Sequence, residues 1–569
     1  MSQTGTRVTT GAVVVLALVT VLSLPDTALN LEVGRRSNDG ASSTERILPV
    51  VAGAFHVHTS RSDGTSTIEE VAEAASTAGL GFVVVTDHGD GTRTPEAPRY
   101  HANVLVLDGI EVSTTGGHYL SVGQRQAPYP LGGEARDVAE DIARLGGFGV
   151  AAHPGSPKNS LRWQDWTTTV DGLEWLNADS AWRDESWLRL VLAMLHYPMR
   201  SPQAIAEVFD RPTELLLRWD GLTQRQRVVA LAGSDAHGAR VQPFSFPSYE
   251  QVFRTFGIRV LLDEAWTGNA AADGAALLEG LRNGRVYTVI DALARPGRFN
   301  FFIRSADGII RSGGVVPVGG PFDVEVKADL PPGGEIRLFE NGAVVRRTRF
   351  PQLSYRASGK PSVFRAEVAL PSAPGSPSVP WILGNPIYVV AGNLASKPSK
   401  RETSNLSSVA LFTNENEISE WTVEHEEESL AAVDSTVSPE GRELAFRYAL
   451  SDSESVDPFV ALVRDGLESL GRFDRIRFRV RGDAPQRLAV QLRTGNEGAV
   501  RWRRSVYVNT ETRDVTVRLQ DMQSLAAKVN ELFRVESRAS LLFVVDTVNT
   551  APATAGVIWL DDVRLERED

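Results

Sequence analysis

The sequence predicts an α/β barrel followed by two all-β sandwich domains. Up to about residue 295, short apolar runs that read as buried strands alternate with stretches of helical periodicity. From 296 to 395, apolar and polar residues alternate between Gly and Pro turns, which is typical of a small antiparallel sandwich. A polar linker at 396–407 then leads to further short strand-like runs over 408–569.

Composition excludes several classes of protein. The formal charge of −12 and a pI near 5.4 argue against a nucleic-acid-binding role, which normally needs a basic face. The chain has no cysteine, so it has neither a disulfide framework nor a thiolate metal site. Any metal must therefore be held by nitrogen and oxygen.

Residues 1–30 read as a signal peptide or an N-terminal anchor. Arg7 precedes an apolar run at 11–24, which Pro25 stops and which is short of the ~20 residues that a membrane span needs. Asp26-Thr-Ala28 matches a cleavage site poorly, so cleavage and retention both remain open. Residues 31–48 read as a polar linker. We expect an exported, periplasmic or extracellular protein that meets the membrane only through this segment.

Two histidines in one strand mark the first candidate site. His56 and His58 lie at alternate positions of an apolar run, so a regular strand would point both imidazoles to one face. Asp63 follows in a Ser-Asp-Gly turn, where its carboxylate can fold back over the strand end. Two nitrogens and one oxygen suit zinc, manganese or iron.

Four later apolar strands also end in metal-binding residue types. Together with the first strand, these five motifs hold six of the nine histidines. Polar ligands repeated at strand ends between helical stretches are the layout of an active site on a β/α barrel. The motifs are Thr86-Asp87-His88, Glu111 with His118 behind it, His153-Pro154, and Ser234-Asp235-Ala236-His237.

Together these motifs resemble the polymerase-and-histidinol-phosphatase (PHP) superfamily of metal-dependent phosphoesterases, in its carbaryl-hydrolase-like branch. The resemblance spans roughly residues 50–290 and implies a distorted barrel of seven β/α units at 49–295, with two or three divalent ions (Zn, Mn or Fe). The implied ligands are His56, His58 and Asp235 for one ion, Glu111 and His153 for a second, with His118 as a further candidate there, and Asp63, His88 and His237 for a third.

His118 differs from the other candidates because it follows Glu111 by seven residues in a glycine-flanked turn. Gly116 and Gly117 allow a tight bend that could bring the imidazole back over Glu111. A turn histidine that only bonds a backbone carbonyl is the alternative.

Four further residues are candidates for catalytic roles. Asp87 could orient the imidazole of His88, or could only cap a strand–loop junction. Arg61, Lys158 and Arg240 lie beside the metal motifs and could hold phosphate oxygens. Each of these cations alone is more often a solvated surface residue, and we expect one of the three to act.

Two helices are visible by periodicity, at 66–75 and 135–147. Residues 156–226 hold six of the eleven tryptophans and read as a helical insertion around a barrel strand at 172–177, in a position to cover the site. We expect most of these tryptophans to pack a core and one or two to line a pocket.

The last module, 408–569, resembles the jelly-roll domains of carbohydrate-binding modules, chiefly through Trp559-Leu-Asp-Asp-Val-Arg-Leu565. It could bind sugar or serve as a rigid spacer.

Three function classes remain. The first is an exported metal-dependent phosphoesterase acting on a small-molecule ester. The second is a metallohydrolase of carboxylic ester, amide or carbamate bonds on the same site. The third is a non-catalytic glycan-binding or envelope protein.

Overall fold

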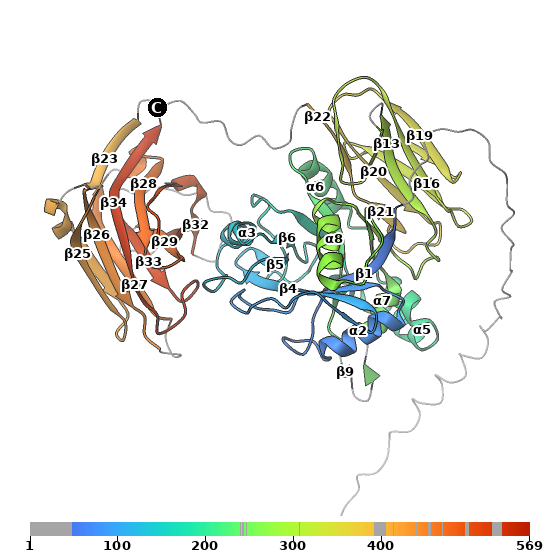
Figure 1. Cartoon of the computed structure of the whole chain (residues 1–569), viewed down its shortest axis with the longest axis horizontal. Helices are drawn as coiled ribbons and strands as arrows, with labels where there is room; N and C mark the ends of the chain where they lie inside the picture. Colours follow the sequence, from blue (N-terminus) through green and yellow to red (C-terminus); the bar gives the residue numbers. More distant parts are fainter. Residues whose placement is uncertain are drawn as a thin grey trace, which may run out of the picture. The chain divides into compact units, whose positions relative to one another are not determined.

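The computed structural model (Figure 1) describes residues 48–238, 240–241, 244–245, 247–305, 308–391, 406–413, 415–439, 441–452, 457–468, 470–494, 500–525 and 538–568. The predicted export segment at 1–30, nearly all of the first linker and most of the second lie outside the described residues. Among the described helices, none combines the length and apolar character that a membrane crossing requires.

Seven strands form a closed barrel, because β1 pairs with β8 as well as with β2. Their side chains are largely buried, as the apolar runs predict. In order around the barrel the strands are β1 (Val50–Val57), β2 (Phe82–Val85), β4 (Val104–Thr114), β5 (Gly117–Val122), β6 (Phe148–Ala151), β7 (Gly172–Asn177) and β8 (Val229–Ala236).

The predicted α/β fold class, a (β/α)7 barrel, is wrong. Strands make up 45 % of the structure and helices 19 %. β5 runs antiparallel to both neighbours and joins β4 by a short hairpin, which needs no crossover helix. The described connection from β2 to β4 holds only β3 (Arg99–His101) and turns, and the one from β6 to β7 only turns.

The two helices predicted by periodicity are present as α2 (Ile68–Thr77) and α3 (Ala135–Arg144). Thr67 and Glu70 form a reciprocal capping box at the start of α2, and Gly79 follows its end with a positive φ. Two more helices, α7 (Tyr249–Thr255) and α8 (Ala270–Arg282), lie between β8 and β12 in the chain.

The helical insertion begins only after β7. Its helices are α4 (Ala178–Asp184), α5 (Trp187–Ala206) and α6 (Thr213–Thr223), and α5 is kinked at Arg200. Trp163, Trp175 and Trp219 are buried, as expected of core residues, whereas Trp187 is exposed.

The second module is a sandwich that shares a sheet with the barrel. β11 (Gly257–Leu261) pairs with β1, β12 (Val286–Val289) with β11, and β21 (Ile382–Gly384) with β12. That sheet continues through β15 (Val315–Pro317), β17 (Glu335–Glu340), β18 (Ala343–Thr348), β20 (Ser362–Ala369) and β22 (Ile387–Val390). The facing sheet contains β13 (Phe299–Ser305), β14 (Gly308–Arg311), β16 (Phe322–Ala328) and β19 (Gln352–Ala357).

The third module is a β-sandwich of two six-stranded antiparallel sheets around an apolar core of its own. One sheet contains β23 (Leu406–Phe412), β25 (Leu430–Ser438), β26 (Gly441–Ala449), β28 (Arg475–Gly482), β31 (Arg513–Arg518) and β34 (Ala555–Glu568). The other contains β24 (Trp421–His425), β27 (Phe459–Glu468), β29 (Gln486–Thr494), β30 (Val500–Val508), β32 (Gln523–Ser524) and β33 (Arg538–Asp546).

Candidate metal centre

The two histidines of β1 converge, but not through the regular pleat of a strand. His56 has φ of 64°, and the pairing of β1 with both neighbours shifts register between Phe55 and Val57. This bulge turns His56 so that its Nε2 lies 3.1 Å from Nε2 of His58.

Two other candidate ligands share the left-handed backbone of His56. His153 has φ of 50° and Asp235 has φ of 47°. This conformation is strained for residues with a Cβ and costs on the order of 1–3 kcal/mol at each position. Such strain collects at functional sites, and here it falls on three side chains that face one another.

The structure gathers eight of the nine predicted ligands into four overlapping groups of three, whose donor atoms lie within 4.8 Å of one another. Four residues, His56, His58, His88 and Glu111, each belong to two groups, so neighbouring ions would share ligands. The groups are His56, His58 and Asp235; His56, Glu111 and His153; His58, Asp63 and His88; and His88, Glu111 and His118.

His118 lies in strand β5 rather than in a turn, because the hairpin bend is complete at Gly117. Its Nδ1 is 2.7 Å from Glu111 Oε1, and Nε2 of His153 is 2.8 Å from the same oxygen. The tight hairpin turn, in which Gly117 has φ of 108°, therefore brings His118 back beside Glu111, as its glycines suggest.

His237, the ninth predicted ligand, stands next to the outer group. Its ring stacks on His58 at 4.3 Å, and its Nε2 lies 3.3 Å from Asp63 Oδ2. The side chain of Asp63 is 53 % exposed, while those of His56 and Glu111 are fully buried. The outer group thus faces solvent and the inner groups lie beneath it.

The donor atoms fit divalent ions. Two ring nitrogens that each lie 2.0–2.1 Å from one ion are about 3 Å apart, which matches the separation between His56 and His58. Within the described part of the chain, buried Asp235 Oδ1 and His153 Nδ1 have no hydrogen-bond partner. Both atoms lie among the other donors, where an ion would satisfy them.

The buried imidazoles and carboxylates of the centre stabilise one another's charged forms. Burial opposes ionisation of Glu111, but His56 and hydrogen bonds from His118 and His153 hold its pKa well below the usual range. Burial also opposes protonation of His58, but the neighbouring carboxylates of Asp235 and Glu111 outweigh it and raise its pKa to about 9. Bound cations would take over the balancing role that protons have on these imidazoles.

Glu174, which the sequence reasoning missed, orients the centre from behind. Its Oε1 lies 2.6 Å from His56 Nδ1, and its Oε2 accepts hydrogen bonds from the backbone N of His153 and from Asn177. A partner on Nδ1 leaves Nε2 of His56 free to face an ion. The one available signal was a lone carboxylate in the otherwise apolar run from Gly172 to Leu176.

Asp87 does something other than orient His88. Its Oδ1 accepts hydrogen bonds from the backbone N of Thr59 at 2.7 Å and from Ser62 Oγ at 2.6 Å, and its Oδ2 accepts one from Thr59 Oγ1. The carboxylate therefore fixes the loop that carries Asp63 away from β1.

Arg61, one of the three predicted cations, is held by carboxylates. It pairs with Glu96 and lies 3.4 Å from Asp108, which Arg93 also binds through both guanidinium nitrogens. Lys158 is exposed in the loop after β6, and the side chain of Arg240 lies outside the described part of the chain.

A cavity of about 400 Å³ opens beside the outer metal group. His88 forms part of its wall, and Arg61 and Arg93 line it together with the carboxylates of Asp87 and Asp90. The cavity thus joins a candidate metal ligand to two guanidinium groups.

Comparison with known proteins gives structural similarities over less than a third of the chain. No known protein-family profile and no curated protein matches it. The chain is similar to the family 11 carbohydrate-binding module of a cellulosomal cellulase of Clostridium thermocellum, at 11 % identity and a TM-score of 0.23, over 29 % of this chain and 95 % of that one. It is also similar to a mannan-recognising carbohydrate-binding module, at 15 % identity and a TM-score of 0.22, over 30 % and 100 %. Nothing found supports the PHP resemblance.

Proposed function

We propose that the chain is a metal-dependent hydrolase, most simply a phosphoesterase. The observation that carries this proposal is the group of buried imidazoles and carboxylates around Glu111, three of which are held on strained backbone. Burial of so many ionisable groups is costly unless they are paired or bind metal. The motif series that resembles the PHP superfamily supports the same chemistry, although this chain does not have the (β/α)7 barrel that the resemblance implies.

The chain's own residues would divide the work. His56, His58, Asp235, Glu111 and His153 would hold the inner ions, with Glu111 shared between neighbours. Bound divalent ions supply a water whose pKa is lowered toward 7 and stabilise the charge that develops on ester oxygens. The exposed outer group would meet the substrate.

The cavity beside His88 favours a phosphate ester over a neutral ester. Arg61 and Arg93 present guanidinium groups there, and guanidinium matches phosphate oxygens in charge and geometry. In the structure both arginines share the buried carboxylate of Asp108. Arg61 would exchange its solvent-exposed partner Glu96 for a phosphate oxygen of the substrate.

Metal analysis joined to an ester screen tests the proposal. Purified protein should contain divalent metal and hydrolyse phosphate esters faster than carboxylate esters, and chelation should abolish turnover. The double variant His56→Ala/His58→Ala should lose metal and activity while it remains folded. His101→Ala/His425→Ala, which removes two histidines outside the centre, is the matched control. Full activity in a metal-free His56→Ala/His58→Ala protein would refute the metallohydrolase.

A second function, sugar binding, rests on a cleft in the third module. The cleft has a volume of about 360 Å³ and presents Phe459 beside the polar side chains of Glu424, Gln491, Arg501 and Asp546. An aromatic ring among hydrogen-bonding groups suits a carbohydrate, which is also what the similar modules in known structures bind, as their names state. Calorimetry with β-glucan and mannan oligosaccharides, on the chain and on the variant Phe459→Ala/Gln491→Ala, tests this proposal. Equal heats of binding for both proteins would show that the cleft is not the sugar site.

We also propose that the protein is exported. This proposal rests on its N-terminal sequence alone.

A further inference from the structure

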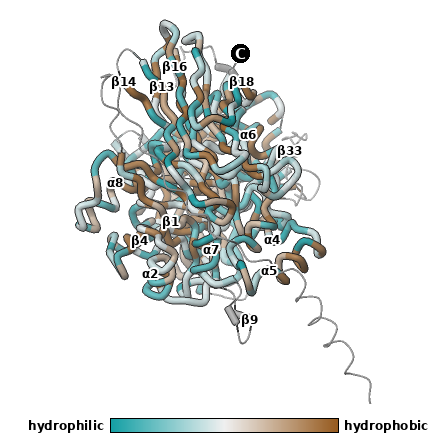
Figure 2. Tube along the Cα trace, turned by 90° about the vertical axis from the view of Figure 1, so that its right-hand side faces the viewer, coloured by the Kyte–Doolittle hydropathy of each residue, from teal (hydrophilic) through white to brown (hydrophobic). Residues whose placement is uncertain are grey.

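Helix α5 presents an apolar side to solvent. Of the 17 large apolar side chains exposed among the described residues, seven belong to this one helix, and Trp187 and Met199 are each 75 % exposed. Figure 2 shows α5 with long brown stretches at the periphery. The seven residues are Trp187, Leu188, Val191, Leu192, Met194, Leu195 and Met199.

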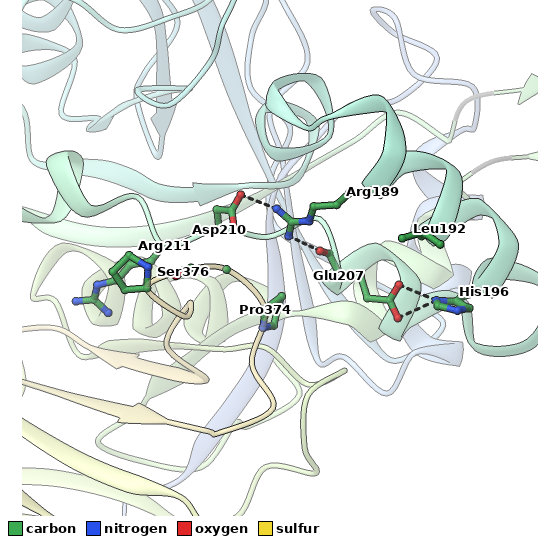
Figure 3. Close-up of a pocket in the computed structure, with 10 residues that line it drawn as sticks. Arg189, Leu192, His196, Glu207, Asp210, Arg211, Pro374 and Ser376 are labelled. Carbon is green, nitrogen blue, oxygen red and sulfur yellow. Dashed lines mark hydrogen bonds and ion pairs between the residues drawn. The ribbon is translucent and has the colours of Figure 1, made fainter. Parts of the chain in front are cut away.

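The side of α5 that faces the protein carries buried Ala193, with Leu190 and Tyr197 packed against the same core, and polar pairs hold one edge of the helix. Arg189 donates to Asp210 at 2.8 Å and to the backbone oxygen of Glu207 at 2.6 Å, and His196 lies 2.8 Å from the Glu207 carboxylate (Figure 3). These pairs line a cavity of about 820 Å³ together with Leu192, which lies at the edge of the exposed apolar side. α5 is therefore apolar on its exposed side as well as on its buried side, whereas the exposed side of an ordinary amphipathic surface helix is polar.

The width of the apolar side distinguishes between possible partners. At 100° per residue, the seven side chains cover about 160° of the helix circumference over the regular part before Arg200. A seam for one partner helix is narrower, since it uses only two positions in seven. A protein interface also carries about one hydrogen bond per 100–200 Å². On this arc, only Trp187 has a side-chain hydrogen-bond donor.

The sequence supplies an independent reason to expect a membrane nearby. The apolar run at 11–24 is of the kind that directs a chain to a membrane, and residues 25–47 separate it from the first described residue, Leu48. A broad apolar helix side with tryptophan at one end is the pattern of helices that lie in a bilayer interface.

We propose that α5 docks its apolar side into the surface of a lipid bilayer, in parallel with the plane of the membrane. The apolar side would lie at the boundary between the lipid headgroups and the acyl chains. The driving force is the removal of the seven side chains from water. This contact is separate from the N-terminal segment and is independent of the proposed hydrolase activity.

Fluorescence of a label on α5 tests the proposal in the full chain. The protein has no cysteine, so Leu195→Cys and, as control, Val437→Cys each accept one environment-sensitive dye. Val437 is also a large exposed apolar residue, on β25 of the third module. With vesicles of phosphatidylcholine and phosphatidylglycerol, the dye at 195 should shift to the blue and the dye at 437 should not. No shift at 195, or equal shifts at both positions, would overturn the proposal.

A second measurement separates lipid from a second copy of the chain. The triple variant Leu188→Gln/Leu195→Gln/Met199→Gln should lower vesicle partitioning at least about tenfold relative to Phe350→Gln/Leu430→Gln/Val437→Gln, because binding scales with buried apolar area. Unchanged circular dichroism and Tm would show that both variants are folded. A blue shift at 195 that appears with rising protein concentration and without vesicles would replace lipid by a dimer interface.

Discussion

Replacing Glu174 should weaken metal binding at His56 without removing any ligand. Glu174 is 1 % exposed and makes three contacts, to His56, to the backbone N of His153 and to Asn177. Glu174→Gln keeps the side-chain volume but removes the negative charge. It also places an amide NH₂, which can only donate, opposite one of the groups that donate to the carboxylate. Loss of such an outer partner costs about 10–100-fold in metal affinity, or roughly 1.4–2.7 kcal/mol.

A glycine behind Glu174 allows the same test without touching the carboxylate. A Cβ at Gly233 would lie 1.7 Å from Glu174 Oε1, so Gly233→Ala must push the carboxylate off His56. We expect Gly233→Ala and Glu174→Gln to weaken the same ion to a similar degree. If the displaced carboxylate in Gly233→Ala and the neutralised one in Glu174→Gln weaken metal binding equally, the effect comes from the lost orientation of the His56 imidazole.

The assay is calorimetric titration of metal-stripped protein with Zn²⁺ or Mn²⁺, combined with elemental analysis. Glu73→Gln, which neutralises an exposed carboxylate on α2, is the control for net charge. Wild-type affinity and stoichiometry in folded Glu174→Gln and Gly233→Ala would refute the positioning role.

Three further predictions follow from the same geometry. His118→Ala should lower bound metal by about one equivalent while the ion on His56 remains, and a full complement in the folded variant would remove His118 from the centre. Arg61→Gln should raise KM for a phosphate monoester about 10–100-fold at constant metal content, since a hydrogen bond to a charged group contributes about 1.5–3 kcal/mol; Arg99→Gln, outside the cavity, should not. In metal-free protein the folded-state pKa of His58, about 9, lies above its unfolded value of 6.5. Its stabilising protonation is complete below pH 6.5 and lost as pH rises through 9, so Tm should fall over that range, and a flat Tm would contradict it.

The sequence located the strand ends well because apolar runs bounded by polar residues report burial directly. β1, β2, β4, β6 and β8 all lie where such runs predict them. The direction of a strand leaves no comparable trace, so antiparallel β5 and its hairpin went unrecognised and the α/β class was wrong. Pairing between distant segments, such as β12 with β21, likewise cannot be predicted from a local sequence pattern.

His56 and His58 converge as predicted, but not through the strict alternation of side chains on which the prediction was based. Strict alternation places both side chains on one face of a flat strand. In the structure the left-handed residue at His56 breaks that alternation, and convergence comes from the bulge. Glu174 was missed for a related reason, since its partner lies 118 residues away in the chain.

The strained backbone at His56 needs support, and a motif residue supplies it. A bulge releases backbone groups from the strand ladder, and a buried carbonyl without a donor is costly. Ser234 Oγ lies 3.0 Å from the carbonyl oxygen of Phe55 and 2.9 Å from that of His56, so its hydroxyl donates to the carbonyls on either side of the strained φ. In Ser234-Asp-Ala-His237 the serine therefore stabilises the bulge of β1, while its neighbour Asp235 faces the donor atoms that the bulge has turned inward.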